Sequence, residues 1–494
     1  MSAARTADRP TVLGALRSPR ILSREVLAGL VVALALIPEA IAFSIIAGVD
    51  PRVGLFSSFV MAVSIAFVGG RAAMISAATG AVALVVADVA PTHGVEYLLA
   101  TILLAGVFQI LLALFGVAKL LRFIPRSVMV GFVNALAIIV LMSQLPHLIG
   151  VPWLTYPLVA LGVAVIALFP KLTTAIPAPL IGVVVVTALV VAVGWDLPTV
   201  GDQGALPETL PGFLLPAVPL TWETFTTIAP YSAGVAVVGL VESLMTAKLV
   251  DDITDTPSSK SREAAGQGVA QILSSLFGGM GGCAVVGQTM MNVKISGART
   301  RISTFLAGAF LLVLVIVFGD FVASIPMAAL VAVMLMVSYA AFDWHSVRPS
   351  TLRRMPKSET AVMLVTVALT VLTENLAVGV GAGILTAAVL FVRRVAHFTT
   401  VTRTLSDDGS VARYAVEGEL FFASSNDLTT QFSYAEDPSR VVIDMSRSHI
   451  WDASTVAALD AIVHKYAQHG IAAEIVGLND ASGDFHGRLT GNLP

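Results

Sequence analysis

The chain has 494 residues, of which 56% are hydrophobic and only 12% are charged, and its mean hydropathy is +0.87. Uncharged runs long enough to cross about 30 Å of hydrocarbon recur from Glu25 to Arg394, which excludes an ordinary soluble domain and predicts membrane lipid as a partner. The net charge of −3 and the scattered arginines indicate no nucleic-acid partner. The single cysteine, Cys283, excludes an intramolecular disulfide and a cysteine-based metal cage.

The N-terminal segment 1–24 is rich in arginine and precedes an apolar run of about 23 residues, which is too long for the hydrophobic region of a signal peptide. We interpret this run as a retained first membrane span. Hydropathy then predicts the first seven spans at 25–47, 53–68, 74–88, 95–117, 125–144, 154–169 and 178–194.

A polar, proline-rich loop at 195–221 divides the apolar region into two halves. Seven more spans are predicted at 225–250, 262–277, 284–297, 301–318, 324–340, 357–373 and 376–394. The sequence therefore predicts a transport domain at 25–394 that is all-α and contains fourteen segments, in repeats 25–194 and 225–394. Seven is an odd number, so the second repeat is inverted relative to the first. If the N-terminus is cytoplasmic and the spans alternate in direction, nearly all lysines and arginines of this region lie on the cytoplasmic side, with Arg52 as the exception.

Glycine-rich breaks occur at matching places in the two halves, from Gly69 to Gly80 and from Gly278 to Gly287. The helical stretch after each break is about 15 Å long, which covers half of the hydrocarbon thickness. One interpretation is that these glycines only permit close helix packing. Their matched positions instead favour two half-helices whose N-termini face a substrate near the middle of the membrane.

Glu39 and Glu242 are the only acidic residues that we place well inside spans, and they lie at corresponding positions of the two halves. A carboxylate at that depth normally faces a cavity or takes up a proton, although a neutral structural role is the alternative. A bound anion favours the protonated carboxyl group, so we expect H⁺ as the coupling ion. Coordination of Na⁺ by Glu242 and Thr246 is the competing use of the same oxygens.

Four stretches carry a family resemblance. They are residues 36–43 (LIPEAIAF), 75–81 (ISAATGA), 242–252 (ESLMTAKLVDD) and 277–300 (FGGMGGCAVVGQTMMNVKISGART). The last stretch resembles the tenth-segment signature of the SulP anion transporters, solute carrier family 26, and the others resemble its first, third and eighth segments. The resemblance covers nearly the whole chain. It implies core and gate domains, elevator-like alternating access, a homodimer, a bacterial inner membrane location and a cytoplasmic STAS domain.

The sequence departs from the family pattern at the site itself. Gln288 stands where most members have arginine, and Gly281 and Ala78 stand where they have proline. Glu39 stands where members often have glutamine. Without the fixed positive charge, an anion must be attracted by backbone N–H groups and helix dipoles. The substrate-binding residues expected from the resemblance and the half-helix ends are Glu39, Phe43, Thr79, Gly80, Ala81, Ala284, Val285, Val286, Gly287 and Gln288. The ion-coupling residues are Glu39, Glu242 and Thr246.

Residues 398–494 have the composition of a soluble α/β domain. Alternation predicts a strand at 413–422, apolar runs predict strands at 440–445 and 471–477, and helical periodicity covers 453–469. This region resembles a STAS domain. Anti-sigma antagonists carry a phosphorylated serine in the matching loop, but the equivalent position here is Ala453, beside Ser454.

The sequence therefore predicts a secondary active transporter for a small anionic substrate. The candidates are a dicarboxylate such as fumarate, bicarbonate, and sulfate. A passive anion channel and a non-transporting sensor with the STAS-like domain as its output are the alternatives. No catalytic motif, cofactor motif or metal-ligand spacing occurs, so we expect no enzyme, no cofactor and no metal centre.

Overall fold

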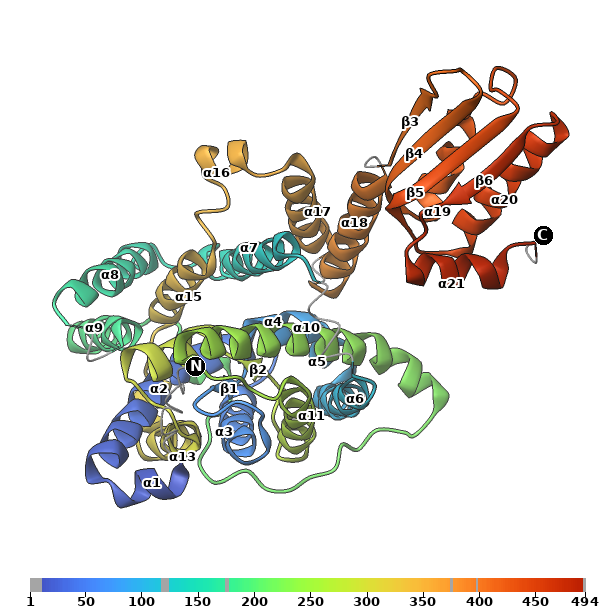
Figure 1. The fold of residues 1–494 in the computed structure, drawn as a ribbon. Helices are drawn as coiled ribbons and strands as arrows, with labels where there is room; N and C mark the ends of the chain where they lie inside the picture. The colour runs from blue at the N-terminus through green and yellow to red at the C-terminus, as the bar shows by residue number, and fades with distance from the viewer. Residues whose placement is uncertain (1–10, 117–123, 174–176, 374–375, 397–398, 492–494) are drawn as a thin grey trace. The chain divides into compact units, whose positions relative to one another are not determined.

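The computed structural model describes residues 11–116, 124–173, 177–373, 376–396 and 399–491. Residues 1–10 of the expected N-terminal segment, the predicted span end at 117, and residues 398 and 492–494 of the expected C-terminal domain lie outside the described residues. The chain forms two compact units, 1–384 and 385–494. Figure 1 shows their elements in chain order.

The first half of the membrane unit is helical apart from one very short strand. Its elements are α1 (Val12–Arg17), α2 (Pro19–Ile46), α3 (Pro51–Val68), β1 (Ser76–Ala77), α4 (Gly80–Val86), α5 (Val89–His93), α6 (Val95–Leu114), α7 (Arg126–Met142), α8 (Thr155–Leu168) and α9 (Ala178–Val193).

The second half also consists of helices and one very short strand. Its elements are α10 (Trp222–Thr254), α11 (Lys260–Leu276), β2 (Cys283–Ala284), α12 (Val286–Met290), a π-helical turn (Met291–Ile295), α13 (Arg301–Val317), α14 (Gly319–Ala323), α15 (Met327–Ala341), α16 (Pro349–Arg354), α17 (Lys357–Thr373) and α18 (Leu376–Ala396).

A helix occupies each range in which hydropathy predicts a span, with two differences in detail. The third range, 74–88, contains the strand β1 and the short helix α4, and α5 begins only after it, at Val89. In the tenth range α12 passes into the π-helical turn. Six helices within the described residues are long and apolar enough to cross a membrane, and five apolar helices are shorter. The chain is therefore a multi-pass membrane protein.

The short strands β1 and β2 lie at the centre of one group of helices and pair antiparallel, with Ser76 opposite Ala284 and Ala77 opposite Cys283 (Figure 1). Two glycines permit this approach. A Cβ atom on Gly282 would lie 1.9 Å from the Ala77 carbonyl oxygen, which is inside any contact distance, and Gly281 has a φ of +73°. The glycine-rich breaks therefore bring two remote segments together.

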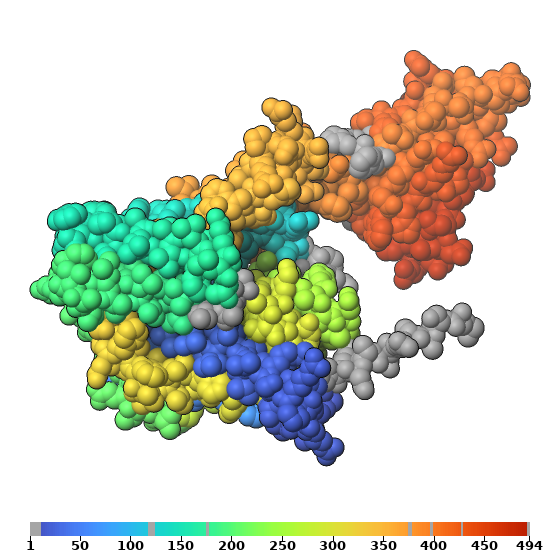
Figure 2. Space-filling model, turned by 90° about the vertical axis from the view of Figure 1, so that its left-hand side faces the viewer, coloured from blue at the N-terminus to red at the C-terminus, as the bar shows by residue number. Residues whose placement is uncertain are grey.

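α3 packs against β1 and α10 packs against β2, and further helices pack against α3 or α10. We call this group, α2, α3, α4, α6, α10, α11, α12 and α13, the inner helices. α6 and α11 cross at Gly106 and Gly268, where a Cβ on either glycine would lie 2.6 Å from the other's carbonyl oxygen. α13 packs against both α2 and α3, and Figure 2 shows the yellow surface of α13 adjoining the blue surface of α1 and α2. Small residues thus allow the inner helices to pack closely.

The remaining long helices of this unit, α7, α8, α9, α15 and α17, pack mainly against one another, and we call them the outer helices. Asn134 of α7 donates to Ser346 Oγ (2.8 Å) and accepts from the Asp343 N–H (2.8 Å), so its side chain joins α7 to the segment after α15. Contacts of α15 and α9 with α2, and of α7 with α4, connect the two groups of helices.

Two carboxyl groups that the sequence does not single out are completely buried at helix ends. Glu25 of α2 accepts hydrogen bonds from the N–H groups of Arg299 and Thr300 and so covers the start of α13. Glu263 of α11 accepts from the N–H groups of Gly70 and Arg71 after α3. Both carboxyl groups accept hydrogen bonds from backbone N–H groups at the start of α13 or after the end of α3, which would otherwise have no partner.

The second unit contains a four-stranded sheet with the order β3-β4-β5-β6. β3 and β4 are antiparallel, whereas β4, β5 and β6 are parallel. Its elements are β3 (Thr400–Leu405), β4 (Val411–Leu420), α19 (Phe422–Leu428), β5 (Arg440–Ile450), α20 (Ala453–Gln468), β6 (Ala472–Val476) and α21 (Asp480–Leu489). The predicted strands and helix correspond to β4, β5, α20 and β6. The edge strand β3 is not predicted, because its mostly exposed residues do not alternate.

The core of this unit holds a buried acid. Asp437 accepts hydrogen bonds from the hydroxyl groups of Tyr414 (2.6 Å) and Tyr466 (2.5 Å) and pairs with Arg403 (2.8 Å). Burial and these hydrogen bonds raise the pKa of Tyr466 above its ordinary value, so the hydroxyl stays a donor.

Candidate functional site

The two short helices α4 and α12 begin directly after the paired strands. Thr79 caps α4, where its hydroxyl accepts a hydrogen bond from the Val82 N–H. Val285 precedes α12 and donates its own N–H to the Ile75 carbonyl (2.8 Å). The first N–H groups of a helix have no partner within it, and the helix dipole adds partial positive charge there. Both helix starts can therefore attract an anion.

The two helix starts differ in the space in front of them. A Cβ on Gly80 would lie 2.9 Å from Phe43 Cε1, so the Phe43 ring packs directly against the start of α4, and Ala81 is buried beside it. A Cβ on Gly287 would meet nothing within 4 Å, and Val286 is 37% exposed. The start of α12 therefore faces open space, whereas α4 is covered by an aromatic ring.

Glu39 lies on α2, one helical turn before Phe43, so both side chains project from the same face of the helix. Glu39 is 7% exposed, and its carboxyl group is hydrogen-bonded to the side chain of Gln288 in α12. This contact joins α2 to the second half-helix. Gln288 therefore presents an amide, and not a cation, beside Glu39.

Glu242 lies on α10 and is half-buried. The Cys283 thiol donates a hydrogen bond to its Oε2 atom (2.9 Å) and also contacts the Thr79 hydroxyl (3.1 Å). Thr246 is one turn further along α10, where its hydroxyl donates to the Glu242 carbonyl oxygen (2.8 Å). The second acid is therefore tied to both half-helix starts through Cys283, while the Thr246 hydroxyl proton is used within its own helix.

Sequence reasoning does not identify two residues of this region. Ser243, next to Glu242, accepts a hydrogen bond from the Ala284 N–H (3.1 Å), and Cys283 carries no signal beyond its small size. Their contacts depend on the pairing of β1 with β2. No local pattern predicts that pairing.

The structure brings the expected residues together as two contact groups. Phe43, Gly80, Glu39 and Gln288 form one, and Thr79, Cys283 and Glu242 form the other. Ala284 and Val285 contribute backbone pairing and are buried.

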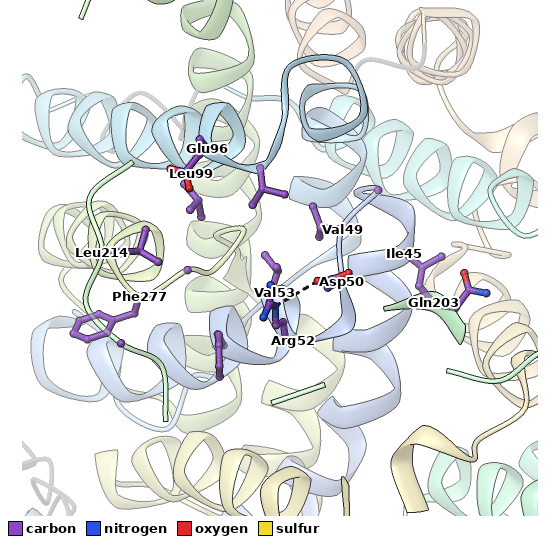
Figure 3. A pocket seen from close by; sticks show the side chains of 15 residues that line it. Ile45, Val49, Asp50, Arg52, Val53, Glu96, Leu99, Gln203, Leu214 and Phe277 are labelled. Carbon is purple, nitrogen blue, oxygen red and sulfur yellow. Dashed lines mark ion pairs between the residues drawn. The ribbon is translucent and has the colours of Figure 1, made fainter. Parts of the chain in front are cut away.

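Figure 3 shows a cavity of about 620 Å³ that none of the expected site residues lines. It lies between the end of α2 and the starts of α3 and α6, with Leu214 and Phe277 on its wall. Its one cation, Arg52, is paired with Asp50 (3.4 Å), and Glu96 adds a second acid. Because acids outnumber cations, this lining disfavours an anion.

Family models match most of the chain. The model described as "Sulfate permease family" matches residues 22–158 and 153–366, and the model described as "STAS domain" matches residues 404–483. The first match covers nearly all of the inner and outer helices and ends within α17, and the second covers β4, β5 and β6 of the sheet.

Similar sequences extend over nearly the same length. The "Putative sulfate transporter YbaR" of Bacillus subtilis (strain 168) is 49% identical over 461 residues, which are 93% of this chain and 95% of that protein. The "Bicarbonate transporter BicA" of Picosynechococcus is 26% identical and covers 90% of this chain and 86% of its own length.

Solved structures show the same fold. Murine solute carrier 26 family member A9, an anion transporter in the inward-facing state, matches 94% of this chain and 87% of its own with a TM-score of 0.81 at 17% identity. The transmembrane domain of a cyanobacterial BicA matches 75% of this chain with a TM-score of 0.65. The fold and its paired half-helices define a multi-pass membrane transport protein with a C-terminal STAS domain. The chain belongs to the sulfate permease (SulP) family, solute carrier family 26.

Proposed function

We propose that this protein is a secondary active transporter of a small anion and that it couples transport to protons. One observation carries the proposal: two half-helices start from one strand pair, and two carboxyl groups, of Glu39 and Glu242, are hydrogen-bonded to Gln288 of α12 and to Cys283 of β2 beside these starts. Helix starts attract an anion, whereas ionised carboxylates repel it. Proton uptake by Glu39 or Glu242 removes the repulsion, so substrate and proton bind together.

Two inverted repeats of seven segments each are part of this proposal. The strand register supports it: Ser76 and Cys283, Ala77 and Ala284, and Gly80 and Gly287 are each 207 positions apart (287 − 80), and exchange of the halves reproduces the pairing. In this arrangement the inner helices form the core domain and the outer helices the gate domain. Elevator-like access moves the core domain, with its substrate, past the gate domain.

The proposed site consists of Glu39, Phe43, Thr79–Ala81, Ala284–Gln288 and Glu242. Sulfate and bicarbonate are the first substrates to test, because the relatives' names include them. Fumarate represents dicarboxylates. We further propose a homodimer in a bacterial inner membrane, with the transport domain at 25–394, the STAS domain at 398–494, and segment 1–24 and the STAS domain in the cytoplasm.

Uptake into proteoliposomes tests this function. Labelled sulfate, bicarbonate and fumarate are offered in turn with an inward proton gradient, with no gradient, and with an inward Na⁺ gradient. Accumulation that requires the proton gradient supports the proposal. Accumulation that requires Na⁺ instead would assign coupling to Glu242 and Thr246. Large anion conductance without pH dependence would identify a channel, and absence of flux for all three anions would favour a sensor.

A further inference from the structure

The only cysteine of the chain lies where three remote segments meet. Cys283 is completely buried in β2, its neighbour in the sheet is Ala77 of β1, and its thiol contacts Thr79 and Glu242. These contacts connect the start of α4, the strand before α12 and the middle of α10. The thiol therefore bridges the first half-helix and one of the two membrane acids.

The hydrogen bonds of Cys283 can be assigned a single direction, from the Thr79 hydroxyl to the thiol and from the thiol to the Glu242 carboxyl group. A thiol has one proton, which Cys283 donates to Glu242 Oε2 at 2.9 Å. The Thr79 hydroxyl, 3.1 Å from the sulfur, can donate to it while its oxygen accepts the Val82 N–H. Among the residues that the structure describes, no other side chain is hydrogen-bonded to the Glu242 carboxyl group. The Cys283 thiol is thus the side-chain donor to this carboxyl group.

We propose that Cys283 is a positioning residue, whose thiol holds the Glu242 carboxyl group toward the start of α4. The proposal deepens the proposed function and rests on it for its transport consequences. Ser243 supports the same geometry, because it accepts the Ala284 N–H and fixes β2 against α10 one residue further along. A residue that only filled space would need neither the donor nor this alignment.

Other charged groups do not take over this role. The elements packed against α10 are α4, α6, α11, β2 and α12. Apart from Cys283, their titratable side chains lie at helix ends: Glu96 and Tyr97 at the start of α6, and Lys260, Arg262 and Glu263 at the start of α11. On α10 itself, Glu223 and Tyr231 precede Glu242, whereas Lys248, Asp251 and Asp252 follow it toward the other end.

Infrared spectroscopy of the purified protein tests the contact directly. Because the chain has one cysteine, its S–H stretching band reports Cys283 alone. We expect a band displaced to lower frequency, as for a hydrogen-bonded thiol, and a return toward the free-thiol position in Glu242→Ala. Glu39→Gln, which alters the other membrane acid, is the matched control and should leave the band in place. An identical band in wild type and Glu242→Ala would overturn the proposal.

Transport kinetics test the consequence. Cys283→Ala removes the donor that positions Glu242 and should raise the substrate concentration for half-maximal uptake about tenfold, the effect of losing one ordinary hydrogen bond. Cys283→Ser keeps a donor and should remain within about twofold of wild type. Ser232→Ala, which removes another buried hydroxyl of α10, controls for general loosening.

Each outcome decides a separate point. Wild-type kinetics in a well-folded Cys283→Ala, or equal losses in the alanine and serine variants, would overturn the positioning role. If the wild-type protein transports none of the anions offered, the proposed function fails. The infrared comparison still decides whether the thiol holds Glu242.

Discussion

At the scale of single residues, the proposed site has backbone donors and two carboxyl groups, and it lacks the fixed cation that the family resemblance leads us to expect in most relatives. Gln288 is hydrogen-bonded to Glu39, and Phe43 packs against Gly80 one turn further along α2. The charge beside Gln288 is that of the Glu39 carboxyl group, which changes when this group takes up a proton. This property makes Glu39 the residue to alter first.

Glu39→Gln should separate substrate binding from proton coupling. An ionised Glu39 repels an anion in a poorly hydrated site, so wild-type uptake should rise as the external pH falls. The glutamine variant cannot take up a proton, and we expect it to exchange substrate while losing stimulation by an inward proton gradient. Uptake measured in proteoliposomes across a pH series checks this expectation. Gradient-driven accumulation with an unchanged pH profile would show that Glu39 is not the coupling residue.

Gly287→Asp should abolish uptake without unfolding the protein. A side chain at this position enters open space, so packing tolerates it, but a carboxylate at the start of α12 replaces the attraction for an anion by repulsion. The isosteric Gly287→Asn is the control for bulk. We expect the aspartate variant to take up substrate at least tenfold more slowly than the asparagine variant. Equal uptake by the two variants would remove Gly287 from the anion site.

At the scale of helices and strands, close packing fixes where the site residues lie. The β1–β2 pair can form only because Gly282 allows contact with Ala77, and α6 approaches α11 only because Gly106 and Gly268 face each other. These contacts hold the inner helices around the half-helices. Loss of these glycine contacts should lower the stability of the protein more than it changes the chemistry of transport.

Gly268→Ala should destabilise the inner helices. Its Cβ would lie 2.6 Å from the Gly106 carbonyl oxygen, a backbone atom that cannot move aside easily, and such overpacking costs about 1–3 kcal/mol. Gly381→Ala in α18 adds a methyl group in open space and should be neutral or slightly stabilising. Thermal unfolding of both variants in detergent measures the difference. An unchanged melting temperature for Gly268→Ala would mean that α6 and α11 can move apart to accept the methyl group at little cost in free energy.

At the scale of the whole molecule, the chain divides into a membrane unit and a unit with its own hydrophobic core. Tyr414 and Tyr466 fill that core beside Asp437, and all three belong to the second unit. The proposed transport residues all belong to the first unit. Transport chemistry should therefore survive the loss of the second unit.

A chain that ends after Arg394 should still transport its substrate, with a lower yield or an altered rate. It retains both half-helices, Glu39 and Glu242. Uptake per correctly inserted molecule, compared with the full-length protein at equal reconstitution, is the measurement. Complete loss of uptake in a monodisperse truncated protein would show that the STAS domain takes part in the transport cycle.

Several features follow from local sequence. Apolar length predicts where the helices lie, because a helix in lipid must satisfy its own backbone donors and acceptors. The two glycine-rich breaks and the two intramembrane acids are also visible without coordinates. Alternating or continuous apolar runs predict β4, β5 and β6, since burial in a sheet leaves a local pattern.

Other features depend on contacts between residues far apart in the chain. Ser76 pairs with Ala284, Cys283 donates to Glu242, and Glu25 covers the start of α13. The sequence alone determined the family signature, the helices and the candidate residues, because these follow from local hydropathy and motif spacing. Only the tertiary structure decided which donors meet which carboxyl groups, because hydrogen-bond partners depend on how the two halves of the chain fold against each other.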